Sequence, residues 1–283
     1  MSSHSSIALR TRNDSILERT EPFLVAARCN VEHLDRKPFG LSIPNGNVID
    51  PTRLASARFL DRLTRLDTLT FGPEGMAMPR WIFYSGAEVP GAIFGFAIRA
   101  EQLPSDMRER LAPEGGPGEL VPLSMYIAVP AQPPHRWFGH NLASLSPQCP
   151  VLALHGLATI TKAIALKTFR CREQLGATQW ASPALNIHAR FGTLELVTAW
   201  TPAHSTAATL TYRVGITDET LRAAAGDPAI DLPRRAADFE VESRDEAAQR
   251  DLQRRIEAGA RFAITDRPRR DSAGAVFVPI ASG

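Results

Sequence analysis

The chain has 283 residues, of which 44% are hydrophobic and 22% are charged. A chain of this length and composition can bury a large core, which excludes intrinsic disorder for most of it. Its 32 basic and 30 acidic residues leave a formal charge of +2. Because no block of like charges interrupts this balance, we expect neither a nucleic-acid partner nor a membrane partner.

Two absences in the sequence bear on location and metals. No apolar run of about 18 residues predicts a transmembrane helix, and the first residues lack the apolar core of a secretory signal, so we expect a cytoplasmic protein. The three cysteines lack CxxC spacing, and the histidines lack HxH and HxxxH spacing. The sequence therefore predicts neither a disulfide framework nor a metal site.

The first half of the chain is predicted to mix strands and helices. Residues 1–20 are polar and aperiodic, which is typical of a flexible arm. Asp50 is expected to cap a helix that starts at Pro51 and ends near Gly72, with leucines on one side and Arg53, Arg58, Arg62 and Arg65 on the other. The remaining predicted elements are strands at 21–30, 120–129 and 141–146, a hairpin of 80–85 with 92–99, and a helix at 101–111.

The second half continues this alternation. Helices are predicted at 156–169 and 182–192, strands at 175–179, 194–200 and 208–214, a helix at 244–258 and a last edge strand at 275–280. This order indicates an α/β (α+β) fold. We expect a flexible N-terminal arm (1–20), a catalytic domain (21–217) and a C-terminal helical extension packed on it (218–283).

The segment 151–192 carries the most information about chemistry. A helix that begins at Gly156 with small residues exposes backbone N–H groups to an anion such as pyrophosphate. The segment resembles the GCN5-related N-acetyltransferase (GNAT) superfamily, whose members hold the acetyl-CoA pyrophosphate on an (R/Q)-x-x-G-x-(G/A) loop. Residues 156–158 match the end of that motif, and 184–192 (ALNIHARFG) match the spacing of the later family helix N-x-x-A-L-x-L-Y-x-K-x-G-F.

Two positions differ from the family pattern. Ala153 stands where the family has arginine or glutamine, and His188 stands where it often has the tyrosine that protonates the departing CoA thiolate. A second loop register at 136–141 supplies an arginine, but prolines follow it and would interrupt the long helix. We therefore prefer the first register.

The resemblance implies a GNAT-like mixed central sheet flanked by helices, with N- and C-terminal extensions, and acyl-CoA as a substrate without a metal. It implies that the thioester cofactor is bound by His155, Gly156, Leu157, Ala158 and Thr159. It also implies that His188 lies near the thioester sulfur as a general acid.

Imidazole suits acid–base work because its pKa lies close to working pH. His140 and His204, at or just after predicted strands, are the candidates for the general base. The alternative for His188 is a satisfied histidine on an amphipathic helix.

The sequence supports an acyltransferase-like enzyme, or a thioester decarboxylase, acting on an acyl-CoA or carrier-protein thioester. Its acyl substrate would be a small molecule or bound to a carrier protein; bacterial specialised metabolism and a homodimer are further expectations. One alternative is a Schiff-base decarboxylase similar to acetoacetate decarboxylases, with Lys162 or Lys167 as nucleophile. The ordinary explanation, which the sequence favours for both lysines, is a solvated side chain on a helix. Another is a non-catalytic module that binds a small molecule or a partner through the proline-rich residues 130–150.

Overall fold

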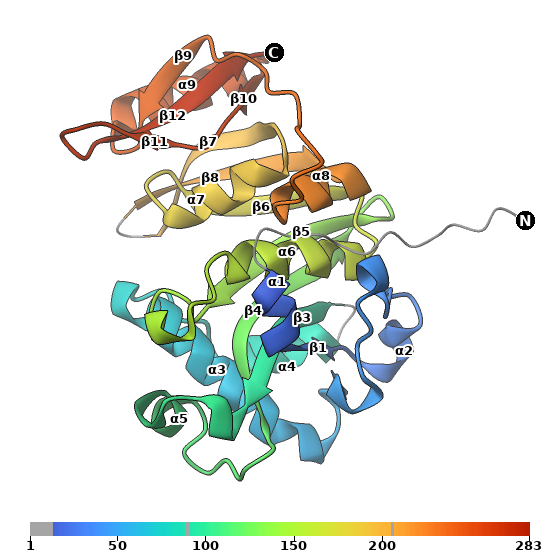
Figure 1. Ribbon diagram of the computed structural model, residues 1–283. Coiled ribbons are helices and arrows are strands. Elements are labelled where there is room, and N and C mark those ends of the chain that lie inside the picture. Colours follow the sequence, from blue (N-terminus) through green and yellow to red (C-terminus); the bar gives the residue numbers. More distant parts are fainter. Residues whose placement is uncertain (1–13, 89–90, 205–206) are drawn as a thin grey trace, which may run out of the picture. The chain divides into compact units, whose positions relative to one another are not determined.

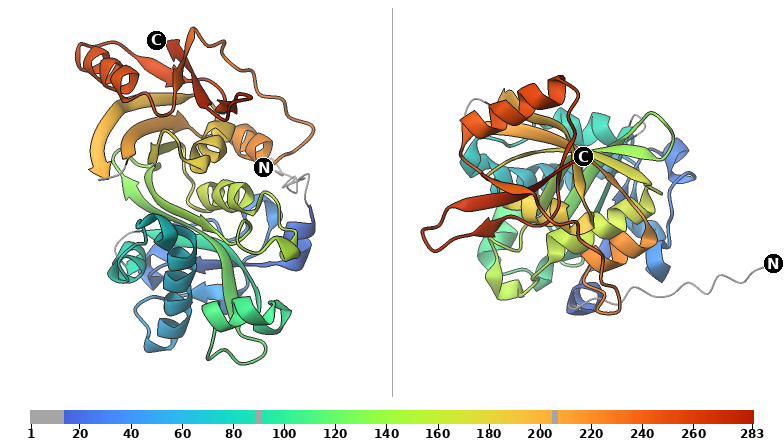
Figure 2. Two further views of the ribbon diagram at one scale, coloured as in Figure 1. Left: turned by 90° about the vertical axis from the view of Figure 1, so that its left-hand side faces the viewer. Right: turned by 90° about the horizontal axis from the view of Figure 1, so that it is seen from above.

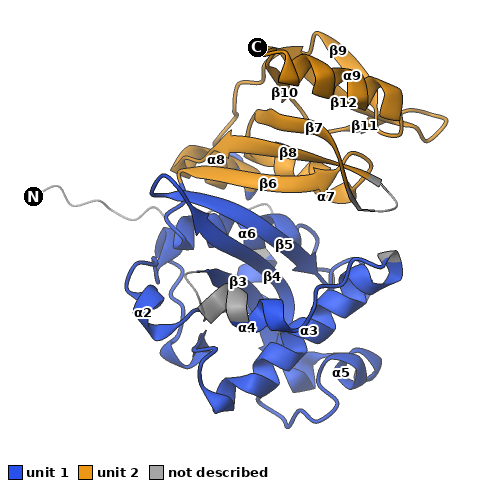
Figure 3. Cartoon of the chain, turned by 180° about the vertical axis from the view of Figure 1, so that it is seen from behind, with its two compact units in different colours: residues 1–171, 225–228 blue, residues 172–224, 229–283 orange. Residues whose placement is uncertain are grey.

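The computed structural model describes residues 14–88, 91–204 and 207–283. The chain divides into two compact units (Figure 3), residues 1–171 with 225–228, and residues 172–224 with 229–283. Each unit has its own strands and helices. The predicted division into an arm, a catalytic domain and a C-terminal extension stays a prediction.

Five strands of the first unit form a mixed sheet in the order β5-β4-β3-β1-β2 (Figure 1). Neighbouring strands are antiparallel, except that β1 and β2 are parallel. The sheet centre is largely apolar, because β3 and β4 carry nearly continuous runs of buried residues. The strands are β1 (Glu21–Val25), β2 (Val48–Ile49), β3 (Ala92–Arg99), β4 (Leu120–Ala131) and β5 (Arg136–Ser144).

Helices cover both faces of this sheet (Figure 2). On one face, α3 (Ala57–Phe71) and α4 (Trp81–Glu88) pack against β3, β4 and β5, while α6 (Leu157–Thr168) packs on the other. A buried hydrogen bond links the sheet to α6, because the hydroxyl groups of Ser124 on β4 and Thr161 on α6 lie 2.6 Å apart. Shorter helices complete the unit: α1 (Asp14–Arg19), α2 (Arg28–Val31) and α5 (Ser105–Leu111).

The second unit has a sheet in the order β12-β10-β7-β8-β6, with β9 and β11 also paired to β12. Helix α9 packs on β7, where Gln253 Oε1 accepts hydrogen bonds from the backbone N–H groups of Ala199 at 2.8 Å and Trp200 at 3.3 Å. The strands are β6 (Glu173–Gln179), β7 (Leu194–His204), β8 (Ala207–Gly215), β9 (Phe239–Glu242), β10 (Phe262–Ile264), β11 (Arg269–Arg270) and β12 (Val276–Ser282). The helices are α7 (Pro183–His188), α8 (Asp218–Ala224) and α9 (Glu246–Glu257).

The predicted fold class, a mixed sheet flanked by helices, is confirmed. From β5 to β8 the elements follow the order strand, loop, helix, strand, helix, strand pair that the GNAT resemblance implies. Ser182 caps α7 as the sequence predicts, because its side-chain oxygen accepts a hydrogen bond from the Ala184 N–H at 3.2 Å. Helix α9 ends before Gly259, whose φ of 95° is left-handed.

Several local predictions for the first unit are wrong. Residues 81–88 form a helix instead of a hairpin strand, and this helix packs on β3 and β4 with Ile82 and Phe83 buried. Within the segment expected to lack regular structure, residues 14–19 form α1, and Ile16 is fully buried. Arg62 does not face solvent but is buried.

The start of the long helix and the last strand also differ from expectation. The Asp50 carboxylate accepts hydrogen bonds from the backbone N–H and the hydroxyl of Thr52, so it stabilises a local turn and α3 begins only at Ala57. Strand β12 is not an edge strand, because β9 and β10 both pair with it. The segment after residue 218 therefore contains four strands as well as two helices.

None of the helices within 14–88, 91–204 and 207–283 is both long enough and apolar enough to span a bilayer.

Candidate functional site

The strand β5 carries a bulge at the centre of the first unit. Ile127 of β4 pairs with Asn141, whereas the next residue, Ala128, pairs with Gly139. His140 is therefore an extra residue with no partner directly opposite. Bulges bend a strand and re-aim its side chains, and they are over-represented next to active sites. The His140 side chain is exposed, and Phe138 lies edge-on to it with the ring centroids 6.3 Å apart.

A buried carboxyl group lies behind this bulge. Asp67 of α3 is fully buried, and its two oxygens accept hydrogen bonds from Asn141 Nδ2 and, at 2.6 Å, from the backbone N–H of Met78. Desolvation raises the pKa of the Asp67 carboxyl, an effect that these hydrogen bonds and the charge of His140 oppose. A positive charge on His140 thus favours the Asp67 carboxylate.

This arrangement has the chemistry of an oriented base. An exposed imidazole can accept a proton from a bound nucleophile, and the neighbouring carboxyl group stabilises the imidazolium that forms. Perturbed carboxyl groups that sit beside a titratable partner are typical of functional sites. The structure thus brings His140, a predicted candidate, together with Asp67, which the sequence analysis did not single out.

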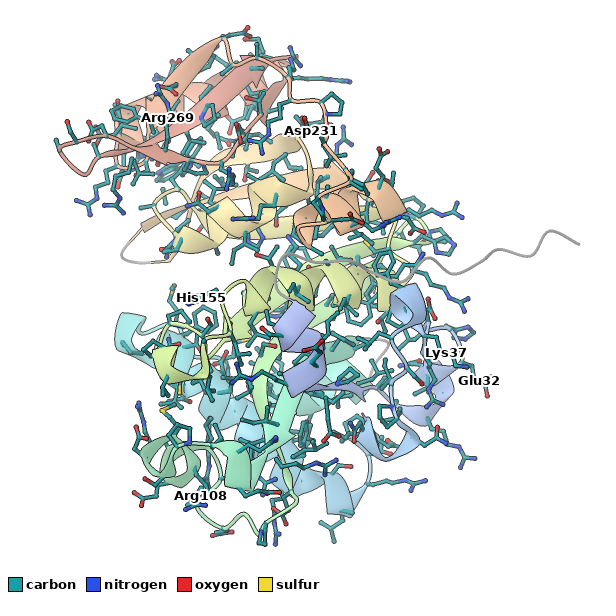
Figure 4. All side chains as sticks on the ribbon, viewed as in Figure 1. Glu32, Lys37, Arg108, His155, Asp231 and Arg269 are labelled. Atoms are coloured by element: carbon teal, nitrogen blue, oxygen red, sulfur yellow. The ribbon has the colours of Figure 1, made fainter. Side chains whose placement is uncertain are left out.

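The start of α6 is the predicted cradle for pyrophosphate. Gly156 precedes the helix with φ 88°, and its carbonyl accepts the first helical bond from Ile160 at 3.0 Å. Gly156 has no side chain that could cap this end, and the Leu157 N–H donates to the Leu154 carbonyl at 3.2 Å. His155, labelled in Figure 4 on the loop leading into the helix, and Gly156 are exposed, Ala158 is half-buried, and Leu157 and Thr159 are buried.

A helix start of this kind favours an anion, since its first N–H groups and the helix dipole point toward it. A Cβ added at Gly156 would meet no atom within 4 Å. Glycine is therefore required there by the backbone conformation and not by lack of space. His140 and residues 155–159 all belong to the first unit.

His188 lies in the second unit, at the end of α7. Its side chain is only 7% exposed, and its ring centroid lies 5.3 Å from that of Tyr212 on β8. The Tyr212 hydroxyl accepts a hydrogen bond from Gln174 Nε2 at 3.2 Å, and burial raises the pKa of this phenol well above its ordinary value. Tyr212 therefore keeps its proton and is a weak acid in the folded protein.

The third candidate, His204, is the last residue of β7, and its side chain lies outside the described residues.

The two lysines of α6 differ in burial. Lys162 is fully buried, and desolvation lowers its pKa well below the ordinary value, so the prediction of a solvated side chain is wrong for it. Lys167 is half-buried, with its ammonium group 5.3 Å from the centroid of the Phe39 ring.

Sequence reasoning missed Asp67 and Tyr212 for different reasons. Asp67 follows Leu63 and Leu66 on the apolar face of α3, so a charge inside an apolar stripe was the available signal. Tyr212 has the pattern of any core aromatic residue on a strand. Within the part of the chain that the structure describes, no three His, Cys, Asp or Glu side chains group as metal ligands would.

Comparisons with known proteins give weak likenesses. A chain in the crystal structure of the NatC complex bound to Gag peptide and CoA is 14% identical, with TM-score 0.39 over 59% of this chain and 96% of that one. A protein described as a GNAT-family acetyltransferase from Desulfovibrio desulfuricans is 13% identical, with TM-score 0.38 over 58% and 95%. TofI in complex with an inhibitor and MTA is 13% identical, with TM-score 0.36 over 74% and 98%.

No protein-family model and no curated protein matches the sequence. The functional assignment therefore depends on the residues of this chain itself.

Proposed function

We propose that the chain is an acyltransferase that takes its acyl group from a CoA or carrier-protein thioester. The observation that carries this proposal is the cluster of His140, Asn141 and Asp67 at the bulge of β5. After β5 the chain runs through residues 145–156 to the start of α6. Acyl transfer from a CoA thioester requires a base and a site for the pyrophosphate. In this proposal β5 supplies the base, and the N-terminal end of the next helix supplies the pyrophosphate site.

In this proposal each group has a defined role. The backbone N–H groups at 156–159, with His155 beside them, hold the pyrophosphate. His140 takes a proton from the acceptor as its nitrogen or oxygen attacks the thioester carbonyl, and the C–S bond then breaks. The Asp67 carboxylate stabilises the imidazolium on His140. The CoA thiolate leaves and takes up a proton from solvent. His188, the predicted general acid, belongs to the second unit, and its role stays a prediction.

The proposal extends to a small-molecule or carrier-bound acyl substrate, a cytoplasmic location, a homodimer and a role in bacterial specialised metabolism. Transfer to an acceptor and decarboxylation of the acyl thioester are its two chemical outcomes. They differ in product, because only transfer attaches the acyl group to a second molecule.

Ligand-induced stabilisation tests thioester binding. CoA, acetyl-CoA and malonyl-CoA would be titrated by calorimetry and thermal shift, since a ligand at 100 times its Kd adds about 2.7 kcal/mol to the free energy of unfolding. Replacement of Gly156 by valine is expected to abolish this gain, because the left-handed N-cap excludes a β-branched residue. No stabilisation of the wild type by any of the three would overturn the proposal.

A matched control separates the loss of binding from backbone strain. Gly259 also has a left-handed φ, 95°, and open space around its Cα, but it follows α9 in the second unit. Gly259→Val should therefore lower the melting temperature as Gly156→Val does, yet retain the response to CoA. Equal loss of the response in both variants would assign the effect to strain alone.

One observation favours a second candidate, the lysine-dependent decarboxylase. Burial lowers the pKa of the Lys162 amine and so favours its neutral form, which is the form that Schiff-base formation with a keto acid needs. Borohydride reduction in the presence of acetoacetate would trap the adduct, to be located by mass spectrometry. An adduct that disappears in Lys162→Met and persists in Lys167→Met would replace the acyltransferase proposal.

A further inference from the structure

The first unit contains an open groove of about 1400 Å³ along β2 and the first turns of α3. Strand β2 is the last strand of the sheet order on the side away from β5, so the groove is separate from the bulge that carries His140. Basic residues outnumber acidic residues in its lining, whereas the whole chain is close to charge balance. The acidic lining residues are Glu32, Asp50 and Glu119, and the basic ones are Arg28, Arg36, Arg53, Arg58, Arg62 and Arg99.

Three of these arginines are engaged by carboxylates. Arg58 Nη1 lies 2.8 Å from Glu119 Oε1, and Arg62 pairs with the other oxygen of the same carboxylate. Arg99 forms a two-pronged pair with Glu21, with both N–O distances 2.6 Å. These pairs fix the groove wall and leave Arg28, Arg36 and Arg53 as the cations that can receive a ligand.

Arg36 is held in place without a counter-charge. Its Nη2 donates to the carbonyl of Ile43 at 3.3 Å and to Asn45 Oδ1 at 2.6 Å, both neutral acceptors. Among the residues that the structure describes, no carboxylate pairs with its guanidinium group. A positioned guanidinium loses little entropy when it binds an anion, which is why such groups serve for phosphate recognition.

Arg28 and Arg53 converge on the same part of the groove. The hydrogen bond from Thr52 lowers the pKa of Asp50, and the charges of Arg53 and Arg28 lower it further. The Arg53 Nε atom is 3.7 Å from Asp50 Oδ2, longer than a hydrogen bond. Asp50 is thus a single carboxylate that already accepts hydrogen bonds from Thr52 and lies near two arginines.

The groove also presents an apolar group. Leu54, between Arg53 and the start of α3, is 92% exposed, and the half-buried Phe59 lines the same groove. Covering exposed apolar surface contributes about 25 cal/mol per Å², so an apolar ligand group here adds affinity. A ligand that suits the groove therefore combines a multiply charged anionic head with an apolar part.

We infer that this groove binds a phosphate monoester that carries an apolar substituent, with Arg28, Arg36 and Arg53 around the phosphate and Leu54 against the substituent. A dianionic phosphate matches three guanidinium groups better than a single carboxylate does. The site is independent of the acyltransferase proposal, because it shares no residue with the His140 cluster or with residues 155–159.

Calorimetric titration of the full chain with octyl phosphate tests this site, with inorganic phosphate, octanoate and octyl glucoside as comparisons. The three octyl compounds are used below the concentrations at which they form micelles. We expect octyl phosphate to bind more tightly than inorganic phosphate and octanoate, no binding of octyl glucoside, and affinity that falls with salt. Equal binding of octyl glucoside, or tighter binding of octanoate, would overturn the assignment.

Variants locate the binding to the groove. Arg28→Gln and Arg53→Gln should each weaken octyl phosphate about fivefold, the upper range for one exposed charge. Leu54→Ser should weaken octyl phosphate but not inorganic phosphate. The control Arg108→Gln removes an exposed arginine of α5 outside the groove, labelled in Figure 4, and should change neither affinity. Unchanged affinity in the two groove arginine variants would contradict the site.

Discussion

Helices α3 and α6 pack on opposite faces of one sheet, and each buries a group whose pKa is shifted by burial, Asp67 on α3 and Lys162 on α6. Helix α3 has an apolar and a polar side, and its Asp67 receives hydrogen bonds from outside the helix. Helix α6 is buried on nearly all sides, with ten of its twelve residues buried, Lys162 among them. Burial favours the uncharged form in both cases, so it raises the pKa of Asp67 and lowers that of Lys162.

The two helices differ in how the buried group reaches the surface. Asp67 acts on an exposed imidazole, because His140 and Asn141 both lie at the bulge that the carboxyl group contacts. The Lys162 side chain has no exposed surface. For this reason α3 supports acid–base chemistry through His140, whereas α6 supports the proposed function through its N-terminal end.

The largest expected effect is on catalysis at the α3 face. His140→Gln should lower the release of CoA from acetyl-CoA or malonyl-CoA by about 10²–10⁴-fold, the usual contribution of a general base. Because the side chain is exposed, the melting temperature should hardly change. A thiol-specific reagent measures the release, and His33→Gln, another exposed histidine of the first unit, serves as control. Full activity of His140→Gln would refute the base assignment.

How far the sequence predicts this molecule depends on how local the decisive contacts are. Strands β3, β4, β7 and β8 and helices α6 and α7 follow from apolar runs, caps and turn residues that lie within each element. Helix α4 does not, because Trp81 to Tyr84 have high strand propensity and only packing on β3 and β4 makes them helical. Likewise, the Asp50-Pro51 signal caps a turn, and α3 starts later.

The candidate site was only partly predictable for the same reason. His140 could be singled out by its residue type and its place at a strand, and glycine at 156 by its place before a helix. Asp67 could not, because its partner Asn141 is 74 positions away in sequence and their contact requires the assembled sheet. The bulge itself is a mismatch between two strands, which neither strand encodes alone.

The next effect concerns α6 and stability. Lys162→Met should raise the free energy of unfolding, because it removes an amine whose charged form is disfavoured by burial. The unfolded wild type holds its proton up to about pH 10.5, whereas the folded state loses it at a lower pH. Wild-type stability should thus rise with pH by up to about 1.4 kcal/mol per unit, above the depressed pKa of Lys162.

Urea unfolding at several pH values measures this slope. Lys167→Met is the control, since Lys167 is half-buried. A wild-type slope that persists unchanged in Lys162→Met would mean that Lys162 does not lose its proton on folding.

The buried Asp67 of α3 should make stability depend on pH with the opposite sign and over a narrower pH range. The raised pKa means that folded Asp67 keeps its proton at pH values where the unfolded residue has lost it. Wild-type stability should therefore fall, by up to about 1.4 kcal/mol per pH unit, between the ordinary value of about 3.9 and the raised pKa. Asp67→Asn should remove this fall.

The variant can keep both hydrogen bonds. Its oxygen accepts from the Met78 N–H, and its amide donates to Asn141 once the Asn141 amide has flipped. Urea unfolding between pH 3 and pH 7 is again the measurement. A steeper fall in the variant than in the wild type would contradict a raised pKa. Activity should decrease as in His140→Gln, since the charge behind the imidazole is gone.

The smallest effect compares two arginines of α3 that share one carboxylate, Glu119. The Arg58 side chain is 60% exposed, whereas that of Arg62 is 6% exposed and also donates to the Leu120 carbonyl at 2.7 Å. Arg58→Gln should cost at most about 1 kcal/mol, because water screens an exposed ion pair. Arg62→Gln should cost more, since it leaves a buried carbonyl without its charged donor. Urea unfolding at low and high salt gives both values, and only the smaller cost should vanish with salt. If both costs vanish alike, the Arg62 guanidinium group is solvated, as that of Arg58 is.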